Sequence, residues 1–262
     1  MFADFLKTIA KHKLELMASK KAYYENLMKN MKPTGQKRYE VFKKAISQQG
    51  RINLIAEIKK ASPSAGLIRE DFNASQIAEI YIKNNAAAIS VLTEDKYFLG
   101  KFSYLAKVSS NCTVPVLMKD FIVHEYQIYE GLFYGASAVL LIVAMLSDDQ
   151  LKGLIQISHR LGLDCLVEVH DEAEVKRAVL AGAEIIGVNN RNLQSLEVDV
   201  NNCLGLIPKV PKGTVIVAES GLKTHEDVRR VREAGAHAVL IGEIFMRSPD
   251  IGNKIKEIMT GK

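Results

Sequence analysis

From residue 53 onward, the chain alternates between short, continuously apolar runs and longer segments whose apolar residues recur at helical spacing. Continuous apolar runs are typical of parallel strands that are buried on both faces, and parallel strands require crossover connections, which are usually helices. The pattern therefore predicts eight strands, at residues 54–58, 88–92, 114–118, 138–143, 165–169, 185–188, 214–218 and 238–241.

Capping signals mark where several of the intervening helices begin. Ser147 precedes Gln150 by three residues, which is the arrangement of a capping box, and apolar residues at helical spacing follow. Two further segments, 171–180 and 224–234, begin with Asp and Thr and carry acidic residues in their first turns. We expect all three segments to be helices.

A weak internal repeat supports the same organisation. Gly-Ala pairs that begin at Gly135, Gly182 and Gly235 each stand between a predicted helix and the next predicted strand. Asn85 holds the corresponding place in a glycine-free copy. Glycine at the end of a helix lets the chain reverse direction at little steric cost. The glycines are 47 and 53 residues apart, about two strand-helix units each.

Eight strand-helix units in roughly 200 residues predict a (β/α)8 TIM barrel, for which 200 to 250 residues is the usual size. We expect one barrel domain over residues 1–262, with residues 1–50 forming an N-terminal helical extension packed on the barrel. The lysine-rich start of this extension carries apolar residues at helical spacing (Phe2, Phe5, Ile9), which favours a solvated helix covering another surface over an RNA-binding arm. A doubly wound sheet is the alternative fold.

Composition narrows the class of protein. Apolar residues make up 48% of the chain and charged residues 25%, which is typical of a globular protein with a buried core. The longest uncharged apolar run, 138–146, has nine residues, whereas a membrane span needs about 20. The three cysteines, Cys112, Cys165 and Cys203, are widely spaced and suit reduced thiols, so we expect a cytoplasmic protein without a disulfide framework or a metal site.

Polar residues gather at the carboxyl ends of the predicted strands, where barrels of this kind place their active sites. Because side chains two residues apart share a face of a strand, several of these polar residues are predicted to point inward together. They are Glu57 and Lys59, Lys119, Glu168, Asn189 and Arg191, Glu219, and Glu243. Apolar residues would normally fill this layer, so the set indicates a binding pocket.

Two glycines suggest a phosphate ligand. Gly221 and Gly242 follow the seventh and eighth strands, where phosphate-binding barrels gather backbone N–H groups. Lys59 and Arg191 would add cations that suit an anionic ligand. The loop at 60–73, after the first strand, is unusually long, and such loops often act as lids.

The sequence leaves the acidity of Lys119 open. A lysine in a dry pocket or beside other cations can have its pKa lowered far enough to act as a general acid near neutral pH. Carboxylates at Glu57, Glu168 and Glu219 would oppose that change in pKa. Lys119 is predicted to point into the pocket, whereas Asp120, one residue on, should point away and serve the structure.

Six motifs stand at these strand ends. They are IAEIKKASPS at 55–64, LMKDFIV at 117–123, VEVH at 167–170, IGVNNRNL at 186–193, AESG at 218–221 and LIGE at 240–243. Together they closely resemble the indole-3-glycerol-phosphate synthase family, in which they occur in the same order, here between about residue 50 and residue 247. IAEIKKASPS and IGVNNRNL are highly specific, whereas AESG and LIGE recur among other phosphate-binding barrels.

The resemblance implies a carboxy-lyase of tryptophan biosynthesis. The family closes the ring of 1-(2-carboxyphenylamino)-1-deoxyribulose 5-phosphate to give indole-3-glycerol phosphate, with loss of CO₂ and water, and uses no metal or organic cofactor. A stand-alone form is implied, because no second enzyme is recognisable beside the barrel. The expected partner is the small phosphosugar-anthranilate substrate, with no nucleic acid or membrane. Association with other tryptophan-pathway enzymes is possible but not required.

The resemblance also implies roles for individual residues. Lys119 would be the general acid of ring closure, Asn189 would orient the substrate, and the second acid-base work would be divided among Lys59, Glu57 and Glu168 in a way that stays open. The implied catalytic set is Lys119, Lys59, Glu57, Glu168, Asn189 and Ser220. The implied substrate-binding set is Ser62, Phe121, Leu140, Arg191, Leu193, Glu219, Gly221, Leu240, Gly242 and Glu243, with Phe121 and Leu140 on either side of the anthranilate ring.

Two alternatives stand beside this interpretation. A sister barrel, such as phosphoribosylanthranilate isomerase or another phosphosugar enzyme, would share Gly221 and Gly242. An aldose-ketose isomerase, however, needs only one acid-base pair and gives no reason for Lys59 and Lys119 on separate strands. A basic RNA-binding module would depend on the lysine-rich N-terminus, but no aromatic residues interleave with the basic ones there in the manner of an RNA-binding patch.

Overall fold

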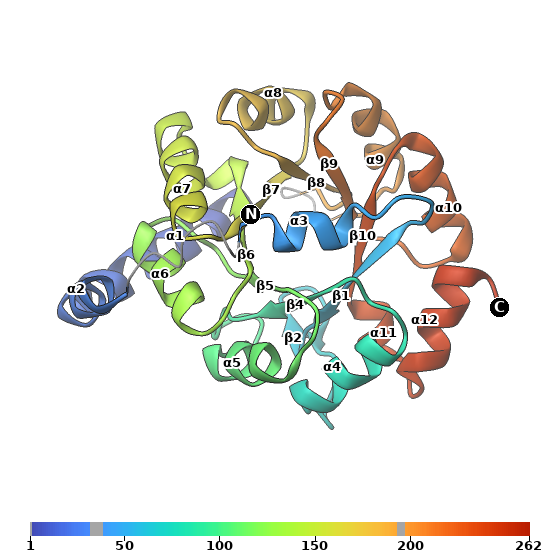
Figure 1. The fold of residues 1–262 in the computed structure, drawn as a ribbon, viewed down its shortest axis with the longest axis horizontal. Helices are drawn as coiled ribbons and strands as arrows, with labels where there is room; N and C mark the ends of the chain where they lie inside the picture. The colour runs from blue at the N-terminus through green and yellow to red at the C-terminus, as the bar shows by residue number, and fades with distance from the viewer. Residues whose placement is uncertain (1, 32–38, 193–196) are drawn as a thin grey trace.

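The computed structural model describes residues 2–31, 39–192 and 197–262, and a parallel eight-stranded barrel lies at its centre (Figure 1). The strands close in the order β1-β10-β9-β8-β7-β6-β5-β4, with helices around the outside. This arrangement confirms the predicted (β/α)8 barrel. The strands are β1 Asn53–Ile58, β4 Ala88–Leu92, β5 Val116–Lys119, β6 Ala138–Ile142, β7 Asp164–Val169, β8 Ile185–Asn189, β9 Val215–Glu219 and β10 Ala238–Ile241.

All eight predicted strands are present, and none of their ends differs from the prediction by more than two residues. β5 begins at Val116 rather than at residue 114, because Pro115 has no N–H to donate to the ladder. The Pro115 carbonyl still accepts a hydrogen bond from the N–H of Ile89. β6 ends at Ile142, since Val143 begins the short 3₁₀ helix η1 (Val143–Met145).

The helices begin where the capping signals predict. Ser147 and Gln150 form a capping box at α7, Asp171 caps α8, and Thr224 forms a second capping box at α10. The helices around the barrel are α4 Ala74–Lys83, α5 Phe102–Asn111, α6 Glu125–Phe133, α7 Asp148–Arg160, α8 Glu172–Leu180, α9 Asn201–Leu206, α10 His225–Ala234, α11 Glu243–Arg247 and α12 Ile251–Thr260, with a 3₁₀ helix, η2, at Ile207–Lys209.

The repeated glycines take the backbone conformation that their position requires. Gly135, Gly182 and Gly235 have φ angles of 87°, 88° and 115°, in the left-handed region that side chains with a Cβ rarely adopt. Asn85, in the glycine-free copy, has a φ of 62°. Asparagine is one of the few other residues that tolerate this region, so the weak repeat reflects one recurring turn.

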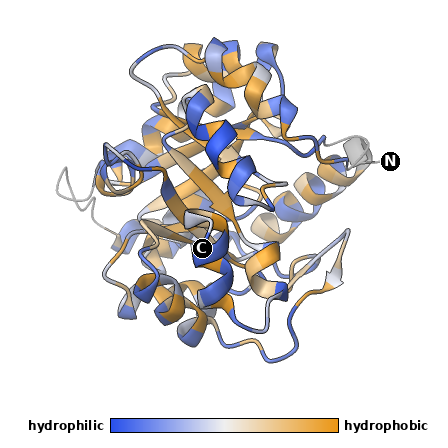
Figure 2. Ribbon diagram, turned by 90° about the vertical axis from the view of Figure 1, so that its right-hand side faces the viewer, coloured by the Kyte–Doolittle hydropathy of each residue, from blue (hydrophilic) through white to orange (hydrophobic). Residues whose placement is uncertain are grey.

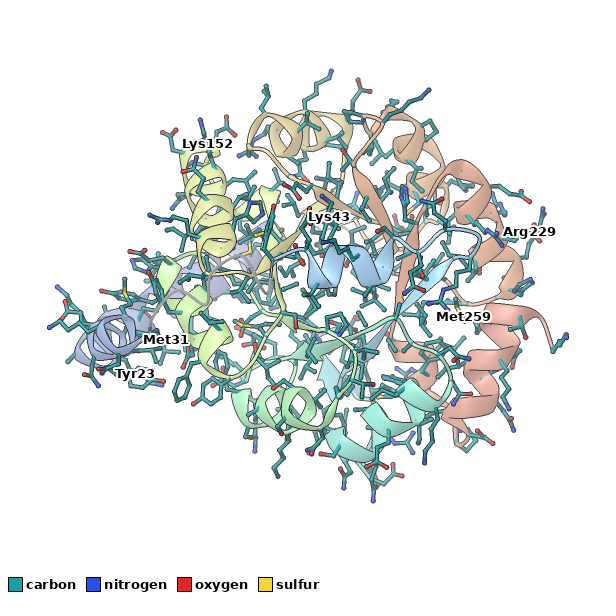
Figure 3. The ribbon with its side chains drawn as sticks, viewed as in Figure 1. Tyr23, Met31, Lys43, Lys152, Arg229 and Met259 are labelled. Carbon is teal, nitrogen blue, oxygen red and sulfur yellow. The ribbon has the colours of Figure 1, made fainter. Side chains whose placement is uncertain are left out.

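Apolar side chains occupy two layers. One layer lies between the strands and the surrounding helices, and Figure 2 shows apolar strands at the centre, with helices that are apolar on one side and hydrophilic on the other. Charged side chains such as Lys152 of α7 and Arg229 of α10 extend outward from the outer helices (Figure 3). The second layer fills the barrel itself with Ile55, Ala88, Leu117, Ala138, Leu140, Ile142, Leu166, Ile185, Val215, Val217, Ala238 and Leu240.

A short helix of the N-terminal extension, α3 (Val41–Ile46), lies across the end of the barrel where the strands begin (Figure 1). Its Phe42 and Ile46 are fully buried and join the apolar layer inside the barrel. The carboxylate of Asp164, at the start of β7, accepts hydrogen bonds from the backbone N–H groups of Phe42 and Lys43. The helix therefore closes this end, and any pocket must open at the other.

The first two helices, α1 (Phe2–Ser19) and α2 (Lys21–Asn30), pack beside the barrel. Lys13 of α1 forms a buried ion pair with Asp120, with 2.7 Å between Nζ and Oδ1. In α2, the hydroxyl of Tyr24 donates to Glu130 of α6 at 3.1 Å. None of the helices within the described residues is both long enough and apolar enough to cross a membrane.

Candidate active site

A cavity of about 530 Å³ opens at the carboxyl ends of the strands and collects nearly all the predicted site residues. Leu193 lies outside the described residues. The predicted residues that line the cavity are Glu57, Lys59, Ser62, Lys119, Phe121, Leu140, Glu168, Asn189, Arg191, Glu219, Ser220, Gly221, Leu240, Gly242 and Glu243.

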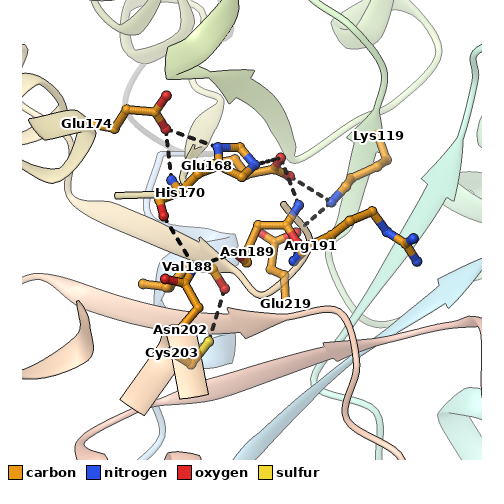
Figure 4. Close-up of polar contacts among 10 residues, drawn as sticks. All are labelled: Lys119, Glu168, His170, Glu174, Val188, Asn189, Arg191, Asn202, Cys203 and Glu219. Atoms are coloured by element: carbon orange, nitrogen blue, oxygen red, sulfur yellow. Dashed lines mark hydrogen bonds and ion pairs between the residues drawn. The ribbon is translucent and has the colours of Figure 1, made fainter. Parts of the chain in front are cut away.

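Lys119 stands between two carboxylates at the end of β5 (Figure 4). Leu117 packs inside the barrel and Met118 outside, so the two-residue period of the strand turns Lys119 inward, as predicted. Its Nζ lies 2.6 Å from Glu219 Oε2 and 3.5 Å from Glu168 Oε2. Both carboxylates are therefore near enough to offset the burial of the ammonium.

The carboxylates decide the protonation state of Lys119. Burial disfavours the ammonium, but Glu219, Glu168 and Glu57 together outweigh burial and raise the pKa of Lys119 above its usual range. The sequence left open whether Lys119 is charged, and the structure favours the charged ammonium. Lys119 is therefore protonated at neutral pH, and its raised pKa makes the ammonium a weaker acid than that of a free lysine.

Glu168 and Glu219 share this lysine but differ in their other contacts. Glu168 also approaches the side chains of Asn189 and His170, and Lys119 and His170 outweigh burial to lower the pKa of Glu168 to about 2. Burial raises the pKa of Glu219 to about 7, despite its shorter contact with Lys119, and Glu168 adds to the rise. The Oε1 atom of Glu219 has no hydrogen-bond partner among the described residues, which explains why burial prevails there.

A second lysine-carboxylate pair lies at the end of β1. Lys59 Nζ is 2.9 Å from Glu57 Oε1, and both side chains are largely buried. Burial opposes ionisation of Glu57, but Lys59 and Lys119 lower its pKa. Gly242 is required beside this pair, because a Cβ there would lie 2.8 Å from the Cβ of Glu57. The cavity thus contains two buried acid-base pairs on separate strands.

A hydrogen bond connects the segment after β8 to the segment after β9. The two residues that follow β9 both have a left-handed backbone conformation. Ser220 and Gly221 have φ angles of 66° and 76°, and the side-chain amide of Asn190 donates to the Ser220 carbonyl at 2.9 Å. The Oδ1 of Asn189 accepts the backbone N–H of Arg191 at 2.9 Å. These bonds hold the predicted phosphate-binding turn beside Arg191.

The apolar side of the cavity includes residues that sequence reasoning did not assign to the site. Phe121 and Leu140 line it as predicted, and Phe98 and Phe5 lie with their ring centroids 6.0 and 6.4 Å from that of Phe121. Phe98 follows β4, the one strand end that carried no predicted site residue. Phe5 comes from α1, and only its helical spacing was visible in the sequence.

Other cavity residues were also missed. Lys223 and Arg247 line the cavity from the segments after β9 and β10, close in sequence to the glycines that were predicted. Searching a few residues past each strand end would have found both. His170 was part of a recognised motif but received no role, although it lies 3.3 Å from Glu168.

The loop after β1 and the side chain of Asp120 both have defined partners. The long loop after β1 forms a small antiparallel hairpin, β2 (Ala61–Ser62) with β3 (Gly66–Leu67), and Ser62 faces the cavity. The carboxylate of Asp120 binds Lys13, the Thr93 hydroxyl and a backbone N–H, which agrees with a structural role. Across the described ranges, no group of three or more His, Cys, Asp or Glu side chains is placed to hold a metal ion.

Comparison with known proteins identifies close relatives over most of the chain. The family model described as "Indole-3-glycerol phosphate synthase" matches residues 6–258. The protein of that name from Acetivibrio thermocellus is 50% identical over 213 residues, covering 81% of this chain and 82% of the relative. The Ruminiclostridium cellulolyticum protein of the same name is 51% identical over 217 residues, covering 83% of each chain.

Solved structures with low sequence identity share the fold. A 3-hexulose-6-phosphate synthase from Salmonella typhimurium is similar with a TM-score of 0.64 and 15% identity, covering 79% of this chain and 97% of that one. A mutant tryptophan synthase alpha-subunit from Pyrococcus furiosus has a TM-score of 0.60 and 12% identity, with the same coverage.

Proposed function

The chain belongs to the indole-3-glycerol phosphate synthase family, and from this membership we propose how its cavity residues divide the work. The reaction is the ring closure of 1-(2-carboxyphenylamino)-1-deoxyribulose 5-phosphate to indole-3-glycerol phosphate, with release of CO₂ and water, in tryptophan biosynthesis. The observation that carries the proposal is the presence of two buried lysine-carboxylate groups on separate strands of one cavity.

We propose Lys119 as the general acid of ring closure. When the aromatic carbon attacks the ribulose carbonyl, negative charge develops on the carbonyl oxygen, and a positioned acid must protonate it. Glu219 and Glu168 keep Lys119 charged and hold its Nζ inside the cavity, so the proton is in place. The raised pKa makes the ammonium a weaker acid, but the alkoxide that forms is a stronger base than the lysine amine and can still take the proton. Glu219, with a pKa of about 7, can return a proton to the lysine between turnovers.

The later steps require a second acid and a base, since a hydroxyl leaves and a proton is removed after decarboxylation. We assign the base to Glu168, because it lines the cavity with Oε2 facing Lys119 at 3.5 Å, and because Lys119 and His170 outweigh burial to lower its pKa, so that it is ionised at neutral pH. Lys59 is the acid that assists the leaving hydroxyl, with Glu57 as its partner at 2.9 Å. Asn189 donates to Glu168 at 3.0 Å and orients it.

Substrate binding divides between the two sides of the cavity. The anthranilate ring lies between Phe121 and Leu140, in the apolar part. The phosphate binds at the backbone N–H groups around Gly221 and Gly242, near the Arg191 guanidinium, which supplies positive charge. The remaining predicted residues, Ser62, Ser220, Leu240 and Glu243, line the substrate.

We also propose that the enzyme acts on a small molecule in a reducing compartment of the cell. A cavity of about 530 Å³ suits a small-molecule substrate, and the free, buried thiols of Cys165 and Cys203 are typical of a reducing compartment. We place the enzyme in the cytoplasm, as a single unit in which the helices α1, α2 and α3 pack on the barrel. It requires neither a nucleic acid nor a membrane, nor another tryptophan-pathway enzyme.

One experiment tests the activity itself. Purified protein is mixed with 1-(2-carboxyphenylamino)-1-deoxyribulose 5-phosphate, and the formation of product is followed by indole fluorescence. We expect product to accumulate without any added protein. A folded sample that gives no product would contradict the proposal, and turnover of a phosphoribosylanthranilate instead would favour the sister isomerase.

A further inference from the structure

His170 lies directly behind Glu168 but does not line the cavity. Glu168 and His170 are two residues apart at the end of β7, so both side chains point to the same face of the barrel. The His170 side chain is 13% exposed, and it is absent from the residues that surround the cavity. The imidazole of His170 therefore reaches the cavity through its contact with Glu168.

The imidazole is held firmly from its other side. Its Nδ1 lies 3.0 Å from Glu174 Oε2, and the same oxygen accepts the backbone N–H of His170 at 2.8 Å. The side-chain amide of Asn202 donates to the His170 carbonyl at 3.3 Å. With Nδ1 engaged by Glu174, Nε2 is the nitrogen that faces Glu168 Oε1, at 3.3 Å (Figure 4).

This contact acts through charge. The 3.3 Å separation is that of an ion pair, while its alignment falls short of a hydrogen bond. Burial disfavours the imidazolium, but Glu168 and Glu174 outweigh burial and raise the pKa of His170 to about 10. Four charged groups within the described ranges surround Glu168: Lys119 on β5, Glu57 on β1, Glu219 on β9 and His170.

The two oxygens of Glu168 have separate surroundings. Oε1 is contacted by His170 and by the side-chain amide of Asn189, at 3.3 and 3.0 Å. Oε2 is left facing Lys119, 3.5 Å away. Among the described residues no histidine contacts Glu219, and burial raises the pKa of Glu219, whereas the pKa of Glu168 is lowered. Environments that drive the pKa values of two carboxyls apart give them different acid-base roles.

We propose that His170, fixed by Glu174, is a positioning residue that keeps Glu168 ionised and turns its Oε2 toward Lys119 and the substrate. The inference rests on the proposed function, in which Glu168 is the base. It accounts for the lower pKa of Glu168 compared with Glu219, although Glu219 makes the shorter contact with Lys119.

Two substitutions separate the charge of His170 from its contact. His170→Gln keeps a neutral N–H donor of similar reach, and His170→Phe removes both the charge and the donor. In both variants we expect the acid limb of the pH profile of kcat to move up by about 1 to 3 units, because an opposite charge near Glu168 is lost. At the pH plateau, kcat should fall on the order of 10-fold in His170→Phe and less in His170→Gln, because misplacement of a catalytic group slows the reaction.

Control variants make the result specific. Glu174→Gln should move the acid limb in the same direction by a smaller amount, since the imidazolium loses one of its two carboxylates. Glu172→Gln removes the same charge from the same helix, where Glu172 pairs only with Lys176 and Lys209 among the described residues, and should leave the profile unchanged. A wild-type pH profile in both His170 variants would overturn the inference.

The failure of the inference and the failure of the proposed function give different results. Active Glu168→Gln would contradict the role of Glu168 as the base. Inactive Glu168→Gln together with wild-type behaviour of both His170 variants would overturn only the role of His170. If the variants do not fold, ¹⁵N NMR of the wild-type imidazole decides. We expect both His170 nitrogens to be protonated at pH 7.5, and a neutral ring would overturn the inference.

Discussion

Lys119 shows how one residue depends on the groups around it. A buried lysine without partners would lose its proton near neutral pH, yet Glu219 and Glu168 lie 2.6 and 3.5 Å from its Nζ and keep the ammonium. The same carboxylates are held close by the lysine, since two unpaired buried carboxylates would repel each other. Substitution of Lys119 therefore removes the proposed general acid and also changes the ionisation of Glu219 and Glu168.

We predict that Lys119→Ala lowers kcat on the order of 10² or more, as expected for the loss of a general acid. The steady-state rate of indole formation measures this, and circular dichroism checks the fold. Lys176→Ala is the control, because Lys176 is exposed and pairs only with Glu172 among the described residues. Near-normal turnover of folded Lys119→Ala would place the acid elsewhere.

The raised pKa of His170 makes a separate prediction about stability. The pKa is about 10 in the folded protein and 6.5 ordinarily, so folding stabilises the protonated ring. This contribution is complete below about pH 6.5 and disappears as the pH rises toward 10. Urea unfolding should show His170→Gln to be less stable than wild type by about 1 to 4 kcal/mol at pH 6, with the difference closing by pH 10. A pH-independent difference would contradict the assignment.

At the scale of elements, α1 connects the N-terminal extension to the site. Lys13 forms its ion pair with Asp120, the residue between Lys119 and Phe121 in the chain. Phe5, two turns earlier in α1, reaches the aromatic side of the cavity. The helix is therefore part of the wall and is not merely a solvated cover.

We predict that Lys13→Met destabilises the protein by about 3 kcal/mol, because breaking a buried pair leaves Asp120 as an uncompensated charge. Urea unfolding at pH 7 measures the loss. Lys11→Met is the matched control on the same helix, since the Lys11 side chain is 80% exposed. A loss below about 1 kcal/mol would show that Thr93 and the backbone suffice to hold Asp120.

We predict that Phe5→Ala raises KM by about 3- to 10-fold with a smaller effect on kcat, because it removes an aromatic contact from the binding side and leaves the acid-base groups in place. Steady-state kinetics with the phosphosugar substrate measures both constants. Leu14→Ala, at a half-exposed position of α1, should leave KM unchanged. An unchanged KM in Phe5→Ala would exclude α1 from substrate binding.

At the scale of the whole molecule, the two ends of the barrel have different tasks. The end where the strands begin is closed by α3, with Phe42 and Ile46 packed into the barrel. The opposite end carries the cavity with its two buried lysine-carboxylate groups. Stability and catalysis should therefore respond to substitutions at different ends.

We predict that Phe42→Ala lowers the free energy of unfolding by about 3 to 5 kcal/mol, as for other large-to-small changes in a core, and leaves kcat nearly unchanged. Phe133→Ala, at a position 57% exposed, should change neither quantity appreciably. Unfolding curves and kcat are measured at a temperature where each variant remains folded. A large loss of kcat in folded Phe42→Ala would mean that the two ends are coupled.

Local patterns in the sequence account for much of what could be predicted. The eight strands follow from continuous apolar runs, and the helix starts from capping residues such as Ser147 and Thr224, which act within a few residues of themselves. The two-residue period of a strand was enough to predict that Glu168 and Lys119 would face one cavity. The position of Pro115 explains the largest shift of a strand start, because its missing N–H is also a local property.

By itself, then, the sequence determined the barrel, the end that carries the site and, through its motifs, the family. Only the tertiary structure determined the protonation states of the site residues and which side chains line the cavity. Lys119 and Glu219 are 100 residues apart in the chain, and their 2.6 Å contact exists because the barrel closes. The pKa values of Lys119 and Glu168 follow from such contacts, and so does the place of Phe5 in the cavity. Electrostatic interactions depend on distance and burial in space, which no local pattern records.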